Sequence, residues 1–205
     1  MIVIINYGMG NLRSIQNMLK AVDTDSTISS NVEDIRKADK LILPGVGAFD
    51  SAIQNIEKLG LREILSDKVL NEKTSILGIC LGLQILTEKS DEGTLKGLGY
   101  IEGETVRFKI NGEQNKIKIP HMGWNTVGTM KDSKLFDDMY DEPRFYFVHS
   151  YHIHCRNDED ILCSTQHGYE FTSAVEKDNV FGVQFHPEKS HKFGMKLLKN
   201  FVELA

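Results

Sequence analysis

The sequence of 205 residues predicts an α/β fold, in which an open, mostly parallel sheet has helices on both faces and a β-rich, antiparallel addition. Two observations predict this fold. In residues 2–87, short apolar runs alternate with stretches whose apolar residues recur at the helical period, as in parallel βαβ units. In residues 97–185, the pattern changes to short strand-like segments between turns, which indicates hairpins.

The first half divides into alternating strands and helices. Strands are expected at the apolar runs Ile2–Ile5, Lys40–Leu43 and Ser75–Ile79. Helices are expected at Leu12–Val22, Ala52–Leu59, Leu61–Leu70 and Leu81–Thr87. In these stretches the apolar residues form one stripe, which is typical of a helix packed on a sheet. Pro44-Gly45 is expected to end the second strand, and Gly60 is expected to separate two helices.

The second half is expected to form strands or hairpins, followed by a final helix. The segment Gly97–Phe108 has several glycines and alternating residues. Further strands are expected at Ile117–Val127, Arg144–Cys155, Ile161–Gln166, Phe171–Val175 and Val180–Phe185. The final helix, about Lys192–Leu204, has apolar residues along one face. No linker rich in Pro, Gly or Ser separates the halves, so we predict one domain over residues 1–205.

Composition excludes some classes of protein. Lys and Arg number 24 against 29 Asp and Glu, which argues against nucleic acid as a partner because such proteins need a basic face. No segment approaches the ~18 consecutive apolar residues of a membrane span, and the apolar N-terminus lacks the basic start of a signal peptide. The three cysteines show no CxxC spacing, so we expect no disulfide framework and a cytoplasmic location.

The sharpest local feature is the segment Gly78-Ile79-Cys80-Leu81-Gly82. A strand is predicted to end at Cys80 and a helix to begin directly after it, with a glycine two residues away on each side. This is the pattern of the nucleophile elbow G-x-S-x-G, with cysteine in place of serine. The start of a helix also favours the reactive thiolate. The alternative is an inert buried cysteine between glycines that serve packing.

A thiolate nucleophile needs a base and a group that orients the base. His186-Pro187-Glu188 follows an apolar strand, at the expected carboxyl edge of the sheet. In an extended segment, His186 and Glu188 point the same way, so the carboxylate can hold one ring nitrogen of the imidazole. The alternative is a turn with a solvated His and Glu.

A second group of residues superficially resembles a metal site. His149, His152, His154 and Cys155 lie within seven residues of each other. On one strand, however, His152 and His154 share a face, while His149 and Cys155 share the other. No distant HxxxH or CxxC pair completes a ligand set, so we predict neither a metal nor another cofactor.

Two glycine-containing loops follow predicted strands. In Leu43–Ala48, two glycines let the backbone turn its N–H groups toward a ligand, as an oxyanion hole requires. The loop Tyr7-Gly8-Met9-Gly10-Asn11 is similar to a dinucleotide loop, but it lacks the third glycine of G-x-G-x-x-G. We therefore do not assign nucleotide binding to it.

The motifs PGVG, GICLGLQ and HPE, in this order, resemble the triad class of glutamine amidotransferases. The stretches INYGMGNLRS, PHMGWN, FYFVHSY and HPEKS are similar to those of glutaminase subunits of imidazole glycerol phosphate synthases. This resemblance covers essentially the whole chain. It implies that the enzyme hydrolyses L-glutamine and passes the ammonia to a (β/α)8-barrel synthase subunit, its partner in a heterodimer.

The resemblance also implies roles for individual residues. Cys80 would be the nucleophile, His186 the acid and base, and Glu188 the group that orients His186. Backbone around Val46, Gly47 and Leu81 would form or border the oxyanion hole. Glutamine would be held by Gly47, Gln84, Ser150 and Tyr151. The docking face for the barrel subunit would include Asn11, Pro120, Trp124, Tyr146 and Lys189.

One segment departs from this pattern. His191-Lys192-Phe193-Gly194 resembles paralogues found with bacterial surface-sugar gene clusters. These are thought to supply ammonia for an amidino group on a sugar, so the alternative function is an amidotransferase of surface-polysaccharide synthesis. A non-catalytic or peptidase-like relative of the same fold is a third reading, against which the set Cys80, His186, Glu188 and Gln84 argues.

Overall fold

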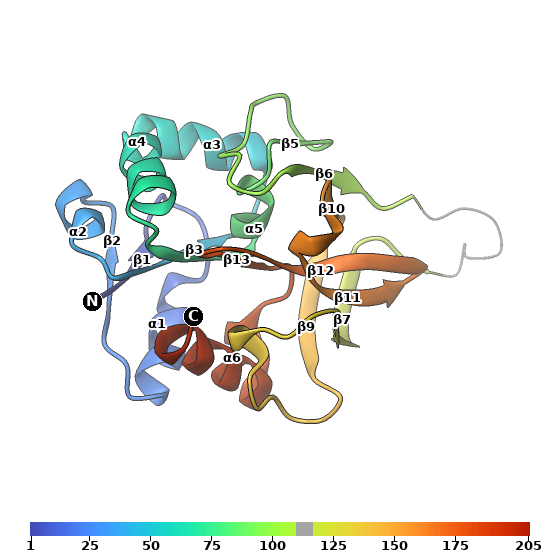
Figure 1. The fold of residues 1–205 in the computed structure, drawn as a ribbon. Helices are drawn as coiled ribbons and strands as arrows, with labels where there is room; N and C mark the ends of the chain where they lie inside the picture. Colours follow the sequence, from blue (N-terminus) through green and yellow to red (C-terminus); the bar gives the residue numbers. More distant parts are fainter. Residues whose placement is uncertain (110–116) are drawn as a thin grey trace.

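The protein is described from a computed structural model, which places residues 1–109 and 117–205. Within these residues, the main sheet has the strand order β2-β1-β3-β4-β13-β12-β10-β6-β5, and β11 and β8 extend it beside β12. A separate sheet pairs β7 with β9. Helices lie on both faces of the main sheet, and both chain ends lie near its β1 side (Figure 1).

The parallel part of the sheet comes from the first half of the chain and one late strand. Its strands are β1 (Ile2–Ile5), β2 (Ser26–Ser29), β3 (Lys40–Gly45), β4 (Ser75–Cys80) and β13 (Val180–Val183). All four pairings among them are parallel. The carboxyl ends of these strands therefore meet at one edge, where open α/β sheets bind ligands.

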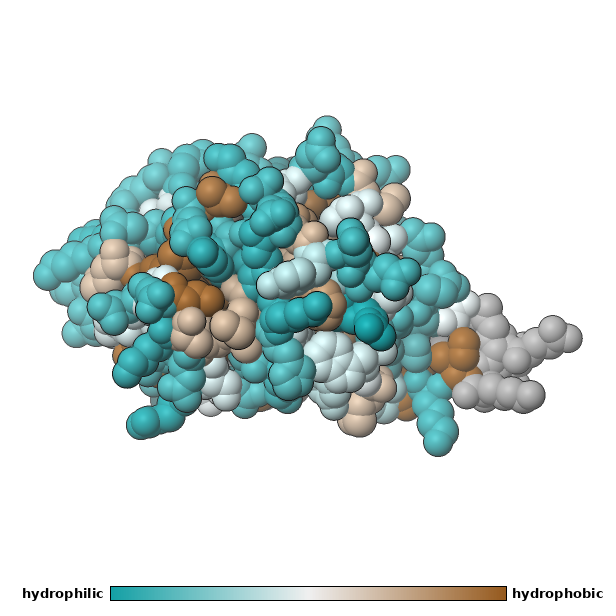
Figure 2. Space-filling model, turned by 90° about the horizontal axis from the view of Figure 1, so that it is seen from below, coloured by the Kyte–Doolittle hydropathy of each residue, from teal (hydrophilic) through white to brown (hydrophobic). Residues whose placement is uncertain are grey.

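The helices form two layers, one on each face (Figure 1). One layer holds α2 (Val32–Arg36), α3 (Phe49–Lys58), α4 (Leu61–Ser66), which continues as a π-helical turn (Asp67–Asn71), and α5 (Leu81–Ile85). The other layer holds α1 (Leu12–Ala21) and α6 (His191–Glu203). From the side of α1 and α6, the surface is mostly hydrophilic with scattered apolar patches (Figure 2).

Alternating residues of each parallel strand fill two hydrophobic cores. In β1, Val3 and Ile5 pack in the core under α3, α4 and α5, whereas Ile2 and Ile4 pack in the core under α1 and α6. This follows from the two-residue period of a strand that is buried on both faces. The continuous apolar runs of the sequence have this origin.

The antiparallel part comes from the second half. It contains β6 (Gly103–Arg107), β8 (Gly128–Thr129), β10 (Tyr151–Cys155), β11 (Ile161–His167) and β12 (Tyr169–Lys177). The two-residue strand β5 (Lys89–Ser90) joins its edge by a parallel pairing with β6. The separate sheet is β7 (His121–Thr126) with β9 (Arg144–His149). Short 3-10 turns lie at Lys134–Phe136, Asp158–Asp160 and Pro187–Lys189.

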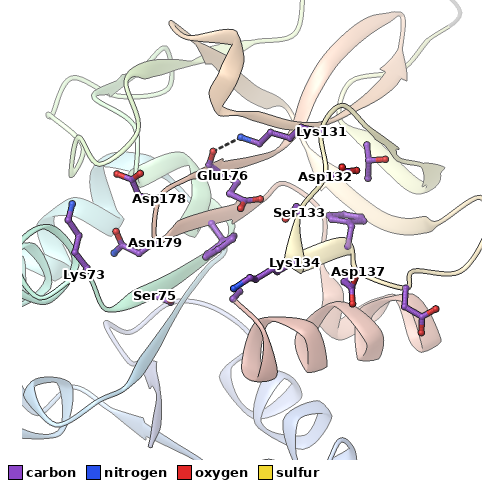
Figure 3. Close-up of a pocket in the computed structure, with 15 residues that line it drawn as sticks. Lys73, Ser75, Lys131, Asp132, Ser133, Lys134, Asp137, Glu176, Asp178 and Asn179 are labelled. Atoms are coloured by element: carbon purple, nitrogen blue, oxygen red, sulfur yellow. Dashed lines mark hydrogen bonds between the residues drawn. The ribbon is translucent and has the colours of Figure 1, made fainter.

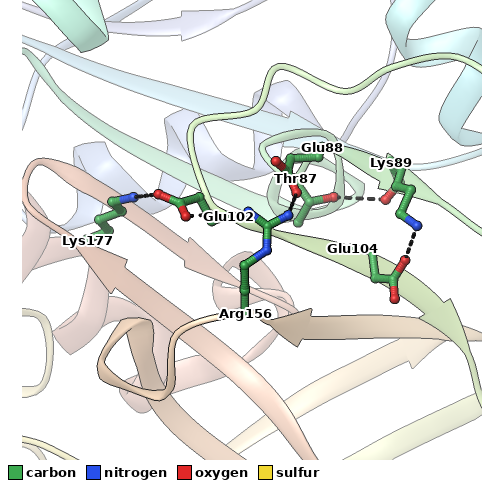
Figure 4. Close-up of polar contacts among 7 residues, drawn as sticks. All are labelled: Thr87, Glu88, Lys89, Glu102, Glu104, Arg156 and Lys177. Carbon is green, nitrogen blue, oxygen red and sulfur yellow. Dashed lines mark hydrogen bonds and ion pairs between the residues drawn. The ribbon is translucent and has the colours of Figure 1, made fainter.

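Exposed ion pairs cross the edge of this antiparallel part (Figure 4). Arg156 contacts Glu88 at 2.6 Å and Glu102 at 3.5 Å, and Lys177 contacts Glu102 at 2.9 Å. Each such pair is worth about 1 kcal/mol or less at a surface. We therefore assign these pairs a structural role.

The mixed α/β fold with a mostly parallel sheet agrees with the prediction, but several elements differ from it. β2 and α2 were not predicted, because β2 is a polar strand at the sheet edge and α2 has only five residues. β3 continues through Pro44 to Gly45, where a stop was expected. Within the described residues, the pairing of β3 with β1 ends at Ile42, and beyond it β3 pairs with β4 alone. One side of β3 is therefore unpaired at Pro44, where a missing N–H costs little.

The stretch Arg144–Cys155 forms two strands in different sheets, because the chain turns at Ser150. No described helix is long and apolar enough to cross a membrane.

Candidate active site

Cys80 lies at a strained turn between β4 and α5. Its φ of 55° is unusual for a residue other than glycine and marks stored backbone strain. A Cβ at Gly78 would lie 2.8 Å from the Leu83 backbone, and one at Gly82 would lie 1.7 Å from the Leu43 carbonyl oxygen. Both glycines are therefore needed for close backbone approach, and the turn has the elbow geometry that the sequence predicts.

His186 and Glu188 lie beside Cys80, at the end of β13. His186 Nδ1 is 2.8 Å from Glu188 Oε1, and each side chain is only 2% exposed. The pair forms on a 3-10 turn and not on the extended segment that the sequence suggested. The backbone N–H of His186 donates to the Tyr146 carbonyl at 2.9 Å, which anchors the turn to β9.

The charges around His186 favour its protonated form. Burial lowers the pKa of His186, but hydrogen bonding and charge from Cys80 and Glu188 outweigh it and raise the pKa to about 10. Nε2 of His186 is buried and makes no hydrogen bond of ordinary geometry within the described residues. An imidazolium next to a thiol supports the thiolate that nucleophilic attack requires.

A cavity of about 330 Å³ joins these groups to the predicted binding residues. Its lining includes nine positions named from the sequence: Val46, Gly47, Cys80, Leu81, Gln84, Pro120, Ser150, Tyr151 and His186. Glu188 lies behind His186 and outside this lining. Glu92, Val148 and His149 also line the cavity and were not assigned to it from the sequence, although Val148 and His149 lie in the FYFVHSY stretch.

Gln84, which lines the cavity, contacts a second buried glutamine, Gln184. Gln84 Nε2 donates to the Tyr151 carbonyl at 3.2 Å and to Gln184 Oε1 at 3.0 Å. Gln184 is fully buried, and its Nε2 is 3.7 Å from the sulfur of Cys80. Gln184 was not predicted from the sequence, although a glutamine inside the apolar stretch before His186 is a usable signal, because buried polar groups need partners.

His149 and His121 form a directed chain of hydrogen bonds that ends at Tyr151. Asn125 Nδ2 lies 3.1 Å from His121 Nε2, His121 Nδ1 lies 2.9 Å from His149 Nε2, and His149 Nδ1 lies 2.7 Å from the Tyr151 carbonyl. If the Asn125 amide donates, each ring must donate from Nδ1 and accept at Nε2. Both rings are then neutral.

Burial supports this neutral state. Burial and the nearby His167 lower the pKa of His121 to about 4, and burial lowers the pKa of His149 as well. The chain turns at Ser150, so His149 and Cys155 lie on different strands and not on one face of a single strand, as the sequence suggested. Within residues 1–109 and 117–205, no group of three or more His, Cys, Asp or Glu side chains could hold a metal ion.

The residues assigned to a docking face cluster beside His186 and Glu188. Trp124 is 46% exposed on β7, and its ring stacks on His191 at 5.5 Å between centroids. Lys189 Nζ lies 5.7 Å from the centre of the Tyr146 ring. Asn11 Nδ2 lies 3.4 Å from Glu188 Oε1, so this face is in direct contact with the His–Glu pair.

A larger cavity of about 1130 Å³ contains none of these residues. It lies at the amino ends of β4 and β13, next to Ser75 and Asn179, whereas Cys80 is at the carboxyl end of β4 (Figure 3). Positively charged lysines and negatively charged carboxylates both line it, and Lys131 Nζ donates to the Glu176 carbonyl at 2.8 Å. We see no convergent set of groups in it.

Comparison with known proteins gives full-length matches. The family model "Glutamine amidotransferase class-I" matches residues 3–204. The chain is 57% identical to "Imidazole glycerol phosphate synthase subunit HisH 2" of Methanococcus maripaludis, and the match covers the full length of both proteins. It is 50% identical, with the same complete coverage, to the protein of that name from Pseudomonas aeruginosa.

Solved structures match in fold at low sequence identity. A crystal structure of a glutamine amidotransferase aligns with a TM-score of 0.76 and 17% identity, over 98% of this chain and 97% of that one. A glutamine amidotransferase of Thermotoga maritima aligns with a TM-score of 0.68 and 16% identity, over 98% of this chain and 96% of that one.

Proposed function

This chain belongs to the class I glutamine amidotransferase family, and we propose that it is the glutaminase subunit of an imidazole glycerol phosphate synthase of histidine biosynthesis. The observation that carries the proposal is the cavity in which the Cys80 thiol, at a strained elbow, meets His186, itself held by Glu188. The full-length identity to proteins named HisH supports the choice of this synthase within the family.

In the proposed reaction, the Cys80 thiolate attacks the side-chain amide carbon of L-glutamine. His186 gives its proton to the departing nitrogen, so ammonia leaves and a glutamyl thioester remains. The neutral imidazole then takes a proton from water, whose oxygen attacks the thioester. Glutamate leaves, and Cys80 returns to the thiolate with His186 protonated. Glu188 holds the ring by Nδ1, which keeps Nε2 directed at the reacting atoms.

The remaining lining residues fit the other needs of this reaction. The backbone N–H groups of Val46, Gly47 and Leu81 are the proposed donors to the oxyanion that forms on attack. Gly47 has a φ of 112°, a conformation that a side chain disfavours, so the backbone there can turn toward the cavity. We propose that Gly47, Gln84, Ser150 and Tyr151 hold the amino and carboxylate groups of glutamine.

The partner is part of the proposed function. Free ammonia becomes ammonium in water, so it should pass to the acceptor through a closed passage. We propose that a (β/α)8-barrel synthase subunit docks on the face formed by Asn11, Pro120, Trp124, Tyr146 and Lys189 and receives the ammonia there. The unpaired state of Cys80, Cys155 and Cys163 supports a reducing, cytoplasmic setting for the complex.

A second candidate differs in the acceptor alone. The two relatives named above are numbered "HisH 2", and an additional copy of such a subunit is free to serve another barrel protein. In that case the ammonia would form an amidino group on a surface sugar, as the segment His191–Gly194 also suggests.

The acceptor can be identified directly. Purified chain is mixed with glutamine and either the barrel subunit of imidazole glycerol phosphate synthase or a barrel protein from a surface-sugar cluster, each with its own acceptor. We expect glutamine-dependent imidazole glycerol phosphate formation with the first partner. Product with the second partner alone would reject the histidine-pathway assignment and leave the glutaminase assignment intact.

A further inference from the structure

Tyr7 has a buried hydroxyl group without a hydrogen-bond partner in the described part of the chain. The residue is 1% exposed and follows β1, in the loop between Ile5 and Asn11 to which the proposed reaction gives no task. A phenylalanine would fill the same space without burying a polar atom. An unpaired buried hydroxyl costs free energy, so it calls for an explanation.

The hydroxyl lies against the backbone next to the active site. A Cβ at Gly45 would lie 2.4 Å from the Tyr7 hydroxyl oxygen and 2.9 Å from the backbone nitrogen of Gly82. Gly45 is also the strand partner of Cys80 in the register of β3 and β4. The absence of a side chain at Gly45 is therefore what admits the phenol to this position.

The phenol is held as a donor close to Cys80. Burial, followed by the charge of Cys80, raises the pKa of Tyr7, so the hydroxyl keeps its proton across the working range of pH. A protonated phenol at this place needs an acceptor. An acceptor close to the hydroxyl is the carbonyl oxygen of Gly45. Its peptide joins Gly45, which is buried, to Val46, which is 40% exposed and lines the cavity.

We propose that Tyr7 is a positioning residue of the oxyanion hole. In the reacting enzyme its hydroxyl donates to the Gly45 carbonyl oxygen. This hydrogen bond fixes the Gly45–Val46 peptide, so that the Val46 N–H, on the opposite side of the peptide, points toward the oxyanion. The geometry follows from the trans peptide, in which the C=O and the N–H point in opposite directions. This inference rests on the proposed glutaminase reaction and adds a residue to it.

The Tyr7→Phe variant tests this role in the full chain with its barrel partner. We expect kcat for glutamine hydrolysis to fall about tenfold, which corresponds to the loss of about one net hydrogen bond. The effect should appear in kcat because the oxyanion forms only after glutamine has bound. We expect KM for glutamine to stay unchanged for the same reason. The melting temperature should stay equal or rise, because a buried unpaired hydroxyl has been removed.

Tyr100→Phe is the matched control. Tyr100 is also buried, but its hydroxyl lies 3.1 Å from the Ser66 hydroxyl in the layer of α4. This change should lower the melting temperature and leave kcat unchanged. Alkylation of Cys80 by iodoacetamide should proceed at the wild-type rate in Tyr7→Phe, because the thiol and His186 are untouched.

An unchanged kcat in Tyr7→Phe overturns the proposal, as does a change confined to KM. A melting temperature that falls as it does in Tyr100→Phe also overturns it, since the hydroxyl would then have a structural partner. Failure of the glutaminase assignment is separate, because it would appear as the absence of glutamine hydrolysis by the wild-type chain with its partner.

Discussion

His186 and Glu188 have different tasks in the proposed reaction, and single substitutions should separate them. His186 moves protons in both halves of the reaction, and general acid–base catalysis is worth roughly 10²–10⁴-fold. Glu188 orients and stabilises the ring through one contact of 2.8 Å. We expect His186→Asn to reduce glutamine hydrolysis by about this factor and Glu188→Gln to reduce it less. Equal, small losses in steady-state assays would instead indicate a solvated His–Glu turn.

Gln184 and Asn11 illustrate what single residues reveal only in three dimensions. The catalytic candidates could be predicted because their chemistry is local: a cysteine between glycines, and a histidine two positions from a glutamate. Gln184 approaches the Cys80 sulfur from a segment far away in sequence, directly after β13, and Asn11 approaches Glu188 from the start of α1. Neither contact leaves a periodic pattern, so the sequence alone does not predict them.

At the scale of secondary structure, the elements with long apolar stripes were predictable and the short polar ones were not. β1 and β4 are continuous apolar runs because both of their faces are buried, and α1 and α6 carry an apolar stripe because one face of each is buried. β2 and α2 bury few side chains, and the α2 start depends on one cap, in which the Asn31 side chain accepts from the Glu33 N–H at 2.7 Å. The turn at Ser150 has no Gly or Pro to signal it.

The small sheet of β7 and β9 should lose stability in acid because of His121. The pKa of His121 is about 4 in the folded chain and about 6.5 when unfolded, so the unfolded chain binds the proton first. Its contribution is therefore present above pH 6.5 and is lost as the pH falls toward 4. Each such histidine adds a slope of at most about 1.4 kcal/mol per pH unit.

Denaturant unfolding between pH 7 and 4 measures this slope. We expect His121→Asn to be less stable at pH 7 but to lose stability less steeply in acid than the wild type. His154→Asn is the control, because His154 lies exposed on β10. If the free energy of unfolding falls equally steeply with pH in the wild type and in His121→Asn, the pKa of His121 does not differ between the folded and the unfolded chain.

At the scale of the whole molecule, the partner should control the glutaminase reaction. An uncoupled glutaminase would release ammonia into water, where most of it becomes unreactive ammonium. Gly45 and Gly47 flank the proposed Val46 donor, and their flexibility lets the Gly45–Val46 peptide rotate. We propose that the Val46 N–H points at the oxyanion in the active state and away from it in the inactive state. Losing one such donor costs ~10²–10³-fold, which is enough for on/off control.

We therefore expect the isolated chain to hydrolyse glutamine about 10²–10³-fold more slowly than the complex with an acceptor-loaded barrel subunit. The proposed docking face contacts the proposed catalytic pair through Asn11, which contacts Glu188, and through the Tyr146 carbonyl, which accepts from the His186 N–H. Steady-state glutaminase rates with and without partner and acceptor provide the measurement. An isolated chain that already works at the full rate of the complex would reject partner control.

The most direct test of the proposed function is the Cys80→Ala variant in the assembled synthase, assayed for product with glutamine and, separately, with ammonium salt. We expect glutamine-dependent synthesis to be lost and ammonium-dependent synthesis to continue, because in the proposed reaction Cys80 serves only the release of ammonia from glutamine. Cys163→Ala, which removes a cysteine buried in the core away from the cavity, should keep both activities. Glutamine hydrolysis that persists in a well-folded Cys80→Ala protein would contradict the assignment of Cys80 as the nucleophile.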